Sequence, residues 1–205
     1  MPQLMPVRLL DVAHNSTCDA VIHSPIDPQH LVNYAQWCEF IEQKVNKRIV
    51  DLTDKELDDW HLRGWHWDWD SKAAAPLPLD WRTFSLVCEN NVQGLMLVKL
   101  KVQCRLTEHA GKMLVYVDLL AAAPWNRPAF VASPRYKGVG STMIEAAIHL
   151  SVDEEYEGRI GLHSLASATS FYDWCGMQSM GNDAQYGNLP YYEMNAQSAQ
   201  NFLHR

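Results

Sequence analysis

Apolar residues recur along the chain with two different periods, and these periods predict where helices and strands form. Residues 7–12 alternate loosely between apolar and polar side chains, which indicates a first strand. Between residues 31 and 45, apolar side chains recur at steps of three and four, as on one face of an amphipathic helix. Asp27 and Pro28 provide a cap residue and a proline just inside that helix.

A second helix start lies at Thr53. Thr53 and Glu56 form the pattern of a capping box, in which side chains and backbone satisfy each other's hydrogen bonds. We expect this helix to end near Arg63 and Gly64, because glycine favours helix ends. Residues 1–80 are thus predicted to form an elaborated, largely helical N-terminal part.

Patterns typical of strands begin after residue 80. Residues 83–88 are rich in β-formers, and residues 92–104 form a long apolar stretch. Asn90 and Asn91 mark a tight turn between them. Another turn precedes a third apolar stretch over residues 113–122. Together the three stretches predict an antiparallel meander.

The rest of the chain alternates helical and strand patterns, which indicates a mixed α/β (α+β) fold. In chain order, the patterns predict a helix over residues 139–154, a strand over 159–164, a helix over 167–175, and strands over 178–181 and 190–195. The residues beyond Ala196 are polar, and we expect them to fray.

Composition narrows the kind of protein. A chain of 205 residues suits one domain, residues 1–205, and 47% hydrophobic with 20% charged residues is ordinary for a globular protein. No apolar run is long enough for a membrane span, and the N-terminus lacks the features of a signal peptide. The five cysteines contain no C-x-x-C pair, which argues against a disulfide framework or zinc knuckle and favours a reducing compartment, the cytoplasm. A net charge of −7 disfavours nucleic acid and favours a cationic or amine partner.

A basic loop with two glycines directly precedes the predicted helix over residues 139–154. Its residues are Arg135, Tyr136, Lys137, Gly138, Val139, Gly140 and Ser141. Glycines let the backbone approach a ligand closely, and a helix N-terminus favours an anion such as phosphate. From these residues alone two interpretations stay open: a phosphate-binding loop, and a connecting loop with a basic tip.

Three segments, in the same order, resemble the GNAT superfamily of N-acetyltransferases. The loop matches the R-x-x-G-x-G pattern of that family's acyl-CoA pyrophosphate loop. Residues 115–124 resemble its fourth strand with a terminal proline, and residues 159–177 resemble its fifth strand, the next helix and the F-Y-x-x-x-G-M ending. The resemblance covers residues 83–195. It implies a mixed, mostly antiparallel central sheet that is splayed between its fourth and fifth strands and flanked by helices.

The resemblance also implies roles for individual residues. The loop holds the pyrophosphate of acetyl-CoA, the co-substrate, while strand-end amides at Leu120, Ala121 and Ala122 hold pantetheine and polarise the thioester carbonyl. Asp118 stands where several amine-acetylating relatives carry a glutamate, so we expect it to accept the amine's proton. The alternative is an aspartate that caps a bulge or pairs with an arginine. Tyr172 is expected to donate a proton to the CoA sulfur, with core packing as its alternative.

These features predict an acetyl-CoA-dependent N-acetyltransferase that transfers an acetyl group directly to a primary amine on a small molecule or a protein, without a metal. Relatives are often dimers, so the resemblance also suggests a homodimer. Three departures keep a second prediction open, a catalytically inactive CoA-binding or protein-interaction module. Leu165 replaces the family's usual asparagine, with Ser164 or Ser167 as substitutes, and residues 125–134 separate Pro124 from the loop. The third departure is Asp118, an aspartate where relatives carry a glutamate. A Rossmann-type nucleotide enzyme fits less well, because the glycine loop follows a long meander.

The stretch from Trp65 to Trp69 is unusually aromatic. Its tryptophans either line an acceptor pocket or form a small satellite core. Nearby residues of metal-ligand type are His61, His66, Asp68 and Asp70. Their spacing lacks the helical context of a metal site, so we expect no metal here.

Three other features have open roles. Residues 125–134 form either a lid or wall of the acceptor site or a surface insertion. His163, at the end of a predicted strand, is either a proton shuttle or a hydrogen-bonded core residue. Cys175 is expected to be inert.

Overall fold

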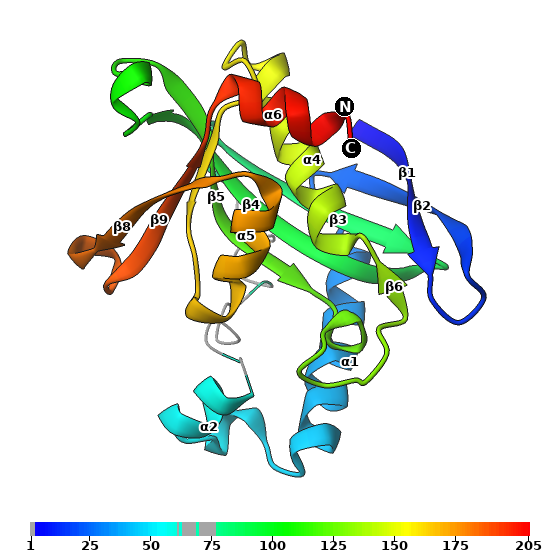
Figure 1. Cartoon of the computed structure of the whole chain (residues 1–205). Coiled ribbons are helices and arrows are strands. Elements are labelled where there is room, and N and C mark those ends of the chain that lie inside the picture. Colours follow the sequence, from blue (N-terminus) through cyan, green and yellow to red (C-terminus); the bar gives the residue numbers. More distant parts are fainter. Residues whose placement is uncertain (1–2, 61, 63–68, 70–76) are drawn as a thin grey trace. The chain divides into compact units, whose positions relative to one another are not determined.

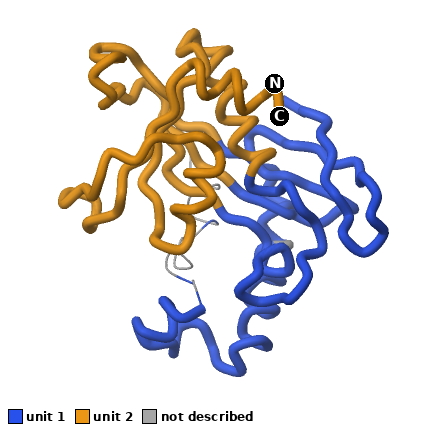
Figure 2. The backbone as a smooth tube through the Cα atoms, in the orientation of Figure 1, with its two compact units in different colours: residues 1–77, 83–95, 121–140 blue, residues 78–82, 96–120, 141–205 orange. Residues whose placement is uncertain are grey.

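The computed structural model describes residues 3–60, 62, 69 and 77–205. The chain forms two compact units, coloured blue and orange in Figure 2. Unit 1 comprises residues 1–77, 83–95 and 121–140, and unit 2 comprises residues 78–82, 96–120 and 141–205. The expectation of one domain that divides near residue 80 stays a prediction.

Among the described residues, nine strands form one sheet in the order β6-β1-β2-β3-β4-β5-β7-β9-β8 (Figure 1). The strands are β1 Gln3–Asp11, β2 Ser16–Ser24, β3 Trp81–Cys88, β4 Asn91–Gln103, β5 Met113–Ala122, β6 Tyr136–Lys137, β7 Ile160–His163, β8 Gln178–Asp183 and β9 Leu189–Met194. β5 and β7 pair in parallel, whereas β1 with β2, β7 with β9 and β8 with β9 are antiparallel. The sheet is therefore mixed, as predicted.

The predicted meander corresponds to β3, β4 and β5, which are neighbours in the sheet. Glu89 and Asn90 connect β3 to β4 with φ angles of 50° and 59°, the left-handed backbone that a two-residue hairpin turn requires. β4 and β5 are connected through a short 3-10 turn, Thr107–His109. The boundaries of these three strands agree with the patterns read from the sequence to within two residues, whereas β1 begins four residues before the predicted start at residue 7.

The helices are α1 Pro28–Val45, α2 Asp54–Asp59, α4 Val139–Asp153, α5 Thr169–Cys175 and α6 Ala196–Leu203. Both predicted start signals are confirmed. The Asp27 side chain accepts a hydrogen bond from the Gln29 amide, and Thr53 with Glu56 makes both bonds of the capping box. None of the described helices is long and apolar enough to cross a membrane.

The predicted end of the second helix is wrong. α2 ends at Asp59, while Arg63 and Gly64 lie outside the described residues. The backbone leaves the helix at Trp60, and the Leu62 amide then bonds the Leu57 carbonyl at 2.6 Å. This early turn lets Leu62, which is 1% exposed, enter a hydrophobic cluster.

The predicted frayed tail is also wrong, because residues beyond Asn195 form α6. The Asn195 side chain accepts a 2.8 Å hydrogen bond from the Ser198 amide and so caps the helix. Ala199 and Phe202 are buried, and their packing stabilises a segment whose composition is mostly polar. β2 is a strand that the patterns did not predict.

Residues 125–134 pack partly against the core of unit 1, where Phe130 is buried while Pro128, Ala132 and Ser133 are exposed, so the segment is not merely a surface insertion. Phe130 is 6% exposed and clusters with Ile41 of α1. The Trp125 ring meets the Trp37 ring edge to face at 6.4 Å. The segment thus forms an apolar wall against α1.

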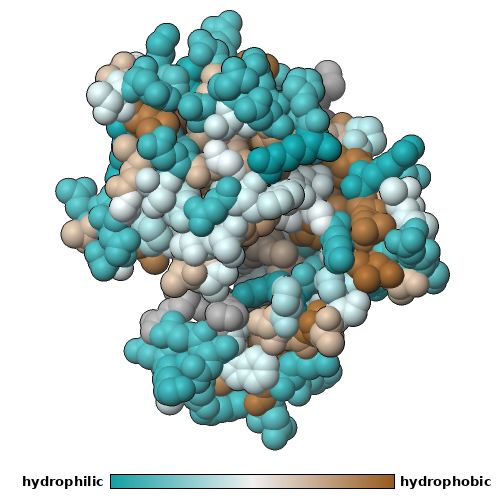
Figure 3. All heavy atoms as spheres, in the orientation of Figure 1, coloured by the Kyte–Doolittle hydropathy of each residue, from teal (hydrophilic) through white to brown (hydrophobic). Residues whose placement is uncertain are grey.

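The surface is mostly hydrophilic on the face shown in Figure 3. Apolar surface is visible over the β1–β2 hairpin, and β1 carries the exposed side chains Leu4 and Leu10. Isolated exposed apolar residues of this kind are normal on a folded protein.

Candidate functional site

The predicted phosphate loop occupies the step from strand β6 into helix α4. Tyr136 and Lys137 form β6, which pairs with β1, and α4 begins at Val139. Gly138 between them has a φ of +96°, a conformation that L side chains rarely adopt. Lys137 and Gly138 are exposed, whereas Val139 is 4% exposed and anchors the helix start. Gly138, the first glycine of the motif, therefore lies at a position whose left-handed backbone favours glycine.

Backbone contacts on both sides hold the start of this loop within unit 1. The Arg135 amide donates to the Trp125 carbonyl, and the Arg135 carbonyl accepts from the Val12 amide, each at 3.0 Å. The Tyr136 amide donates to Asn126 Oδ1 at 2.9 Å. The residues between Pro124 and the loop thus have a definite role, since they position the backbone that enters α4.

A buried glutamine fixes those residues in turn. Gln93 of β4 is 0% exposed, and its Oε1 accepts 2.9 Å hydrogen bonds from Trp125 Nε1 and Asn126 Nδ2. The Gln93 carbonyl also accepts from the Ala123 amide at 2.9 Å. Nothing in the sequence pattern singled out Gln93, because its side-chain partners lie 32 and 33 positions further along the chain.

The charge of Arg135 is compensated. Its guanidinium forms a 2.5 Å ion pair with Glu89, and Glu89 also accepts a 3.0 Å hydrogen bond from the Tyr136 hydroxyl. Burial and the Glu89 carboxylate raise the pKa of Tyr136 above its ordinary value. A pyrophosphate that binds Arg135 must therefore compete with Glu89, while Lys137 carries its charge on an exposed side chain.

The ladder between β5 and β7 ends in the region where the splay was expected. Their ladder has three pairs, the last being Val117 with Leu162. β5 nevertheless continues as a strand to Ala122. The residues beyond the ladder, Leu120, Ala121 and Ala122, are half-buried. A strand end beyond a parallel ladder offers backbone groups to an extended ligand.

Asp118 is the first β5 residue beyond that ladder, and it forms an ion pair. Its Oδ1 lies 2.7 Å from Lys99 Nζ. The Lys99 ammonium also lies 4.4 Å from the centre of the Trp81 ring, a cation–π contact. The sequence-based alternative of an ion pair is thus present, although with a lysine and not with an arginine.

Tyr172 lies on α5 and is 7% exposed. Its ring packs at 5.2 Å from Phe171 and 5.9 Å from Tyr192. Burial raises the pKa of Tyr172 above its ordinary value, so the phenol keeps its proton at neutral pH. Burial likewise raises the pKa of Cys175 to about 12, which agrees with an inert thiol.

His163, which the sequence analysis left as a proton shuttle or a hydrogen-bonded core residue, belongs to a hydrogen-bonded network whose partners the sequence did not indicate. Its Nδ1 lies 2.7 Å from the Tyr116 hydroxyl and its Nε2 lies 3.2 Å from Asp183 Oδ2. The ring stacks on Tyr186 with centroids 3.9 Å apart. Burial lowers the pKa of His163 below its ordinary value.

The geometry of the sheet agrees with solved structures. No protein-family model and no curated protein sequence matches the chain. One similar solved structure is PaiA N-acetyltransferase from Thermoplasma acidophilum in complex with coenzyme A. It is 13% identical, with 85% of this chain and 98% of that chain covered and a TM-score of 0.51. Another is FeeM, an N-acyl amino acid synthase from uncultured soil microbes. It is 14% identical, with 87% of this chain and 90% of that chain covered and a TM-score of 0.52. The chain has the GNAT acyl-CoA N-acyltransferase fold.

In this GNAT fold, β5 and β7 take the places of the predicted fourth and fifth strands. Leu165, which departs from the family pattern, follows β7 and is half-buried. Ser164 is 0% exposed, and its hydroxyl donates to the Leu165 carbonyl at 2.8 Å. Ser164 is therefore engaged by the backbone, while Ser167 is exposed.

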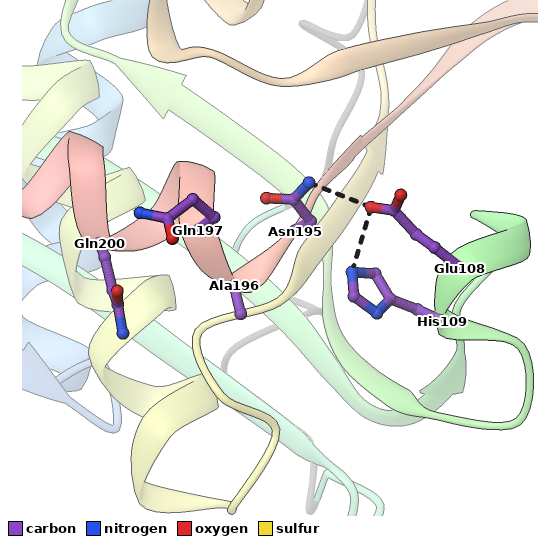
Figure 4. Close-up of a pocket in the computed structure, with 6 residues that line it drawn as sticks. All are labelled: Glu108, His109, Asn195, Ala196, Gln197 and Gln200. Carbon is purple, nitrogen blue, oxygen red and sulfur yellow. Dashed lines mark hydrogen bonds and ion pairs between the residues drawn. The ribbon is translucent and has the colours of Figure 1, made fainter.

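A shallow pocket of 330 Å³ in unit 2 lies apart from these sequence positions (Figure 4). Its lining residues are Glu108, His109, Asn195, Ala196, Gln197 and Gln200. Asn195 Nδ2 donates to Glu108 Oε1 at 3.1 Å, and His109 Nε2 lies 3.4 Å from the same oxygen. None of the residues that the GNAT resemblance singles out lines this pocket.

The remaining candidates concern metal binding and the aromatic stretch. Within the described ranges, no group of three or more His, Cys, Asp or Glu side chains is placed to hold a metal ion. His61, His66, Asp68 and Asp70 lie outside those ranges, as do Trp65 and Trp67. Trp69 is described and is 1% exposed, so this ring is part of a core.

Proposed function

We propose that the protein is an acetyl-CoA-dependent N-acetyltransferase that moves an acetyl group directly to a primary amine. The parting of β5 and β7 inside a GNAT fold carries this proposal, because it leaves a strand end beyond a parallel ladder. The glycine loop with its left-handed Gly138 supports it from unit 1. No metal takes part in this proposal.

The proposed donor site uses backbone more than side chains. Its residues are Leu120, Ala121 and Ala122 on β5, and Arg135, Tyr136, Lys137, Gly138, Val139, Gly140 and Ser141 at the start of α4. The N-terminus of α4, a helix of 15 residues, favours the negative charge of a pyrophosphate. The amides at the end of β5 accept the pantetheine as an added strand, and one of them polarises the thioester carbonyl.

Two side chains move protons in the proposed reaction. The thioester supplies the acetyl group, whose carbonyl carbon is attacked by the neutral amine. We assign the amine's proton to the Asp118 oxygen Oδ2, since Oδ1 is bonded to Lys99. Tyr172 donates its hydroxyl proton to the leaving sulfur, a role that suits a phenol held neutral by burial.

The acceptor is proposed to be an amine-bearing molecule, either a small compound or a protein. The net charge of −7 supports a cationic acceptor and argues against nucleic acid. Scattered cysteines support action in the cytoplasm, and the fold analogy supports a homodimer. A membrane partner is not part of the proposal.

Release of CoA from acetyl-CoA in the presence of a panel of primary amines tests this function. We expect turnover with at least one amine, and a fall in kcat of about 10²-fold or more in Tyr172→Phe. The affinity for acetyl-CoA should stay unchanged in that variant. Tyr156→Phe, a matched change at a half-buried tyrosine of unit 2, should leave kcat unchanged.

The same experiment separates the enzyme from a binding module. Tight binding of acetyl-CoA without turnover on any amine would favour the inactive module. Equal turnover in wild type and Tyr172→Phe would remove Tyr172 from the mechanism.

A further inference from the structure

The polar network around His163 lies where β5 and β7 separate, within unit 2. Tyr116 of β5 pairs with Gly161 of β7, and the ladder ends one pair later. Side chains alternate between the two faces of a strand, so Tyr116 and Asp118 share one face with His163. The opening of the ladder therefore has a carboxylate on one strand and an imidazole at the equivalent position of the other.

Direct hydrogen bonds connect three of these groups in a row. Asp183 carries a carboxylate that can only accept hydrogen bonds, so His163 Nε2 bears the ring proton that faces it at 3.2 Å. His163 Nδ1 is then an acceptor, and the Tyr116 hydroxyl donates to it at 2.7 Å. The order is phenol, imidazole and carboxylate, and it leaves one lone pair of the tyrosine oxygen for a further donor.

The carboxylate end of this row is held in place. Asp183 Oδ2 also forms an ion pair with Arg105, at 2.5 Å. Asp183 Oδ1 accepts a 2.9 Å hydrogen bond from the Gln185 amide. These bonds lower the pKa of Asp183 to about 2, so the carboxylate stays charged beside the imidazole. The titratable and charged groups around His163 are Tyr116 and Asp118 from β5, Arg105 after β4, Asp183 at the end of β8, Tyr186 after β8 and Tyr191 from β9.

The two central groups differ in what they can do with a proton. Burial raises the pKa of Tyr116, so its hydroxyl is protonated at neutral pH. The hydroxyl can therefore donate its proton onward, but it does not stay deprotonated. Burial lowers the pKa of His163, so the imidazole is neutral and can receive one. An imidazolium at this place is stabilised by the Asp183 carboxylate.

We propose that Tyr116, His163 and Asp183 form a proton relay that returns Asp118 to its charged form after each acetyl transfer. The proposal rests on the proposed function, with Asp118 as the first proton acceptor. The O–H bond of protonated Asp118 breaks as its proton passes through a water molecule to the Tyr116 oxygen. The Tyr116 O–H bond breaks as an N–H bond forms at His163 Nδ1, the His163 Nε2–H bond breaks as its proton passes to Asp183 Oδ2, and Asp183 releases that proton to solvent. A half-turn of the His163 ring then returns its remaining N–H to Asp183 and leaves an acceptor nitrogen facing Tyr116.

His163→Gln tests the relay, because a glutamine amide accepts from Tyr116 and donates to Asp183 but binds no extra proton. We expect kcat to fall on the order of 10²-fold, while the affinity for acetyl-CoA is unchanged. Neutral His163 is required, so kcat of the wild type should decline as pH falls through the His163 pKa, which burial lowers from its ordinary value. This acid limb should be missing in the variant.

Two further variants keep the test decisive. Tyr116→Phe removes a single oxygen atom and should reduce kcat similarly. In His163→Ala, added imidazole should restore part of the lost rate, whereas a purely structural role would not respond. His149→Gln, the same change at an exposed histidine of α4, should leave kcat and its pH profile unchanged.

The outcomes distinguish the two proposals. Turnover in the wild type with unchanged kcat and acid limb in both His163→Gln and Tyr116→Phe would overturn the relay alone. A wild type that binds acetyl-CoA but acetylates no amine would overturn the transferase and, with it, the relay.

Discussion

Replacing Gln93 with leucine should destabilise unit 1 and disturb the loop that enters α4. The side chain is 0% exposed, and its Oε1 is the acceptor for Trp125 Nε1 and Asn126 Nδ2, both at 2.9 Å. Asn126 in turn holds the Tyr136 amide at 2.9 Å. The substitution removes the acceptor and leaves two donors without it.

The magnitude follows from these contacts. A buried donor that loses its acceptor costs about 1–3 kcal/mol, and because Trp125 and Asn126 are only half-buried, we take about 1–2 kcal/mol for each. The additional apolar surface of leucine returns about 1 kcal/mol. The free energy of unfolding should therefore fall by about 2 kcal/mol.

Urea denaturation measures this change, with Gln200→Leu as the matched control at an exposed position. The control should stay within about 0.5 kcal/mol of the wild type. Gln93→Leu should also bind acetyl-CoA about tenfold more weakly, equivalent to about 1.4 kcal/mol, because the loop backbone loses its support. If the unfolding free energy of Gln93→Leu equals that of the control, Gln93 does not anchor this segment.

Three other predictions concern stability. Thr53→Ala should lower the free energy of unfolding by about 1 kcal/mol in urea denaturation, and Thr53→Ser should restore it, because the capping box needs a hydroxyl. Phe202→Ala should cost about 3 kcal/mol and reduce helical circular dichroism, since burial of this ring holds α6; unchanged helicity would contradict it. The folded-state pKa of Asp183 is lowered to about 2. Its contribution to the free energy of unfolding is therefore full above about pH 4 and is lost as pH falls toward 2. Asp183→Asn should flatten the decline of the thermal midpoint over that range, and an equally steep decline would show that other groups cause it.

Features that depend on neighbouring residues were readable from the sequence. The capping box at Thr53 and Glu56 is complete within four residues, and the need for a glycine at position 138 is a property of one backbone turn. Stretches of β-forming and apolar residues between turn signals likewise located β3, β4 and β5, because such stretches are local features of the sequence. The GNAT fold was predicted from three segments that resemble that family and occur in the same order.

Features that depend on distant residues were not readable. Lys99 and Asp118 are 19 positions apart, and Tyr116 and His163 are 47 apart, so only the folded sheet brings each pair together. The α6 segment has a polar composition, and its helix depends on burial of a few side chains against the rest of unit 2. Sequence periodicity carries no information on such partners.

Calorimetric titration of acetyl-CoA into the wild type and Gly138→Glu tests the central claim most directly. Gly138 has a φ of +96° at the start of α4, so a glutamate there both strains the loop and repels a pyrophosphate. Gly111→Glu is the control, because Gly111 has a φ of +79° with no atom within 4 Å of an added Cβ. The account predicts binding to the wild type and to Gly111→Glu but not to Gly138→Glu. Equal binding to all three, or binding to none, would contradict a donor site at this loop.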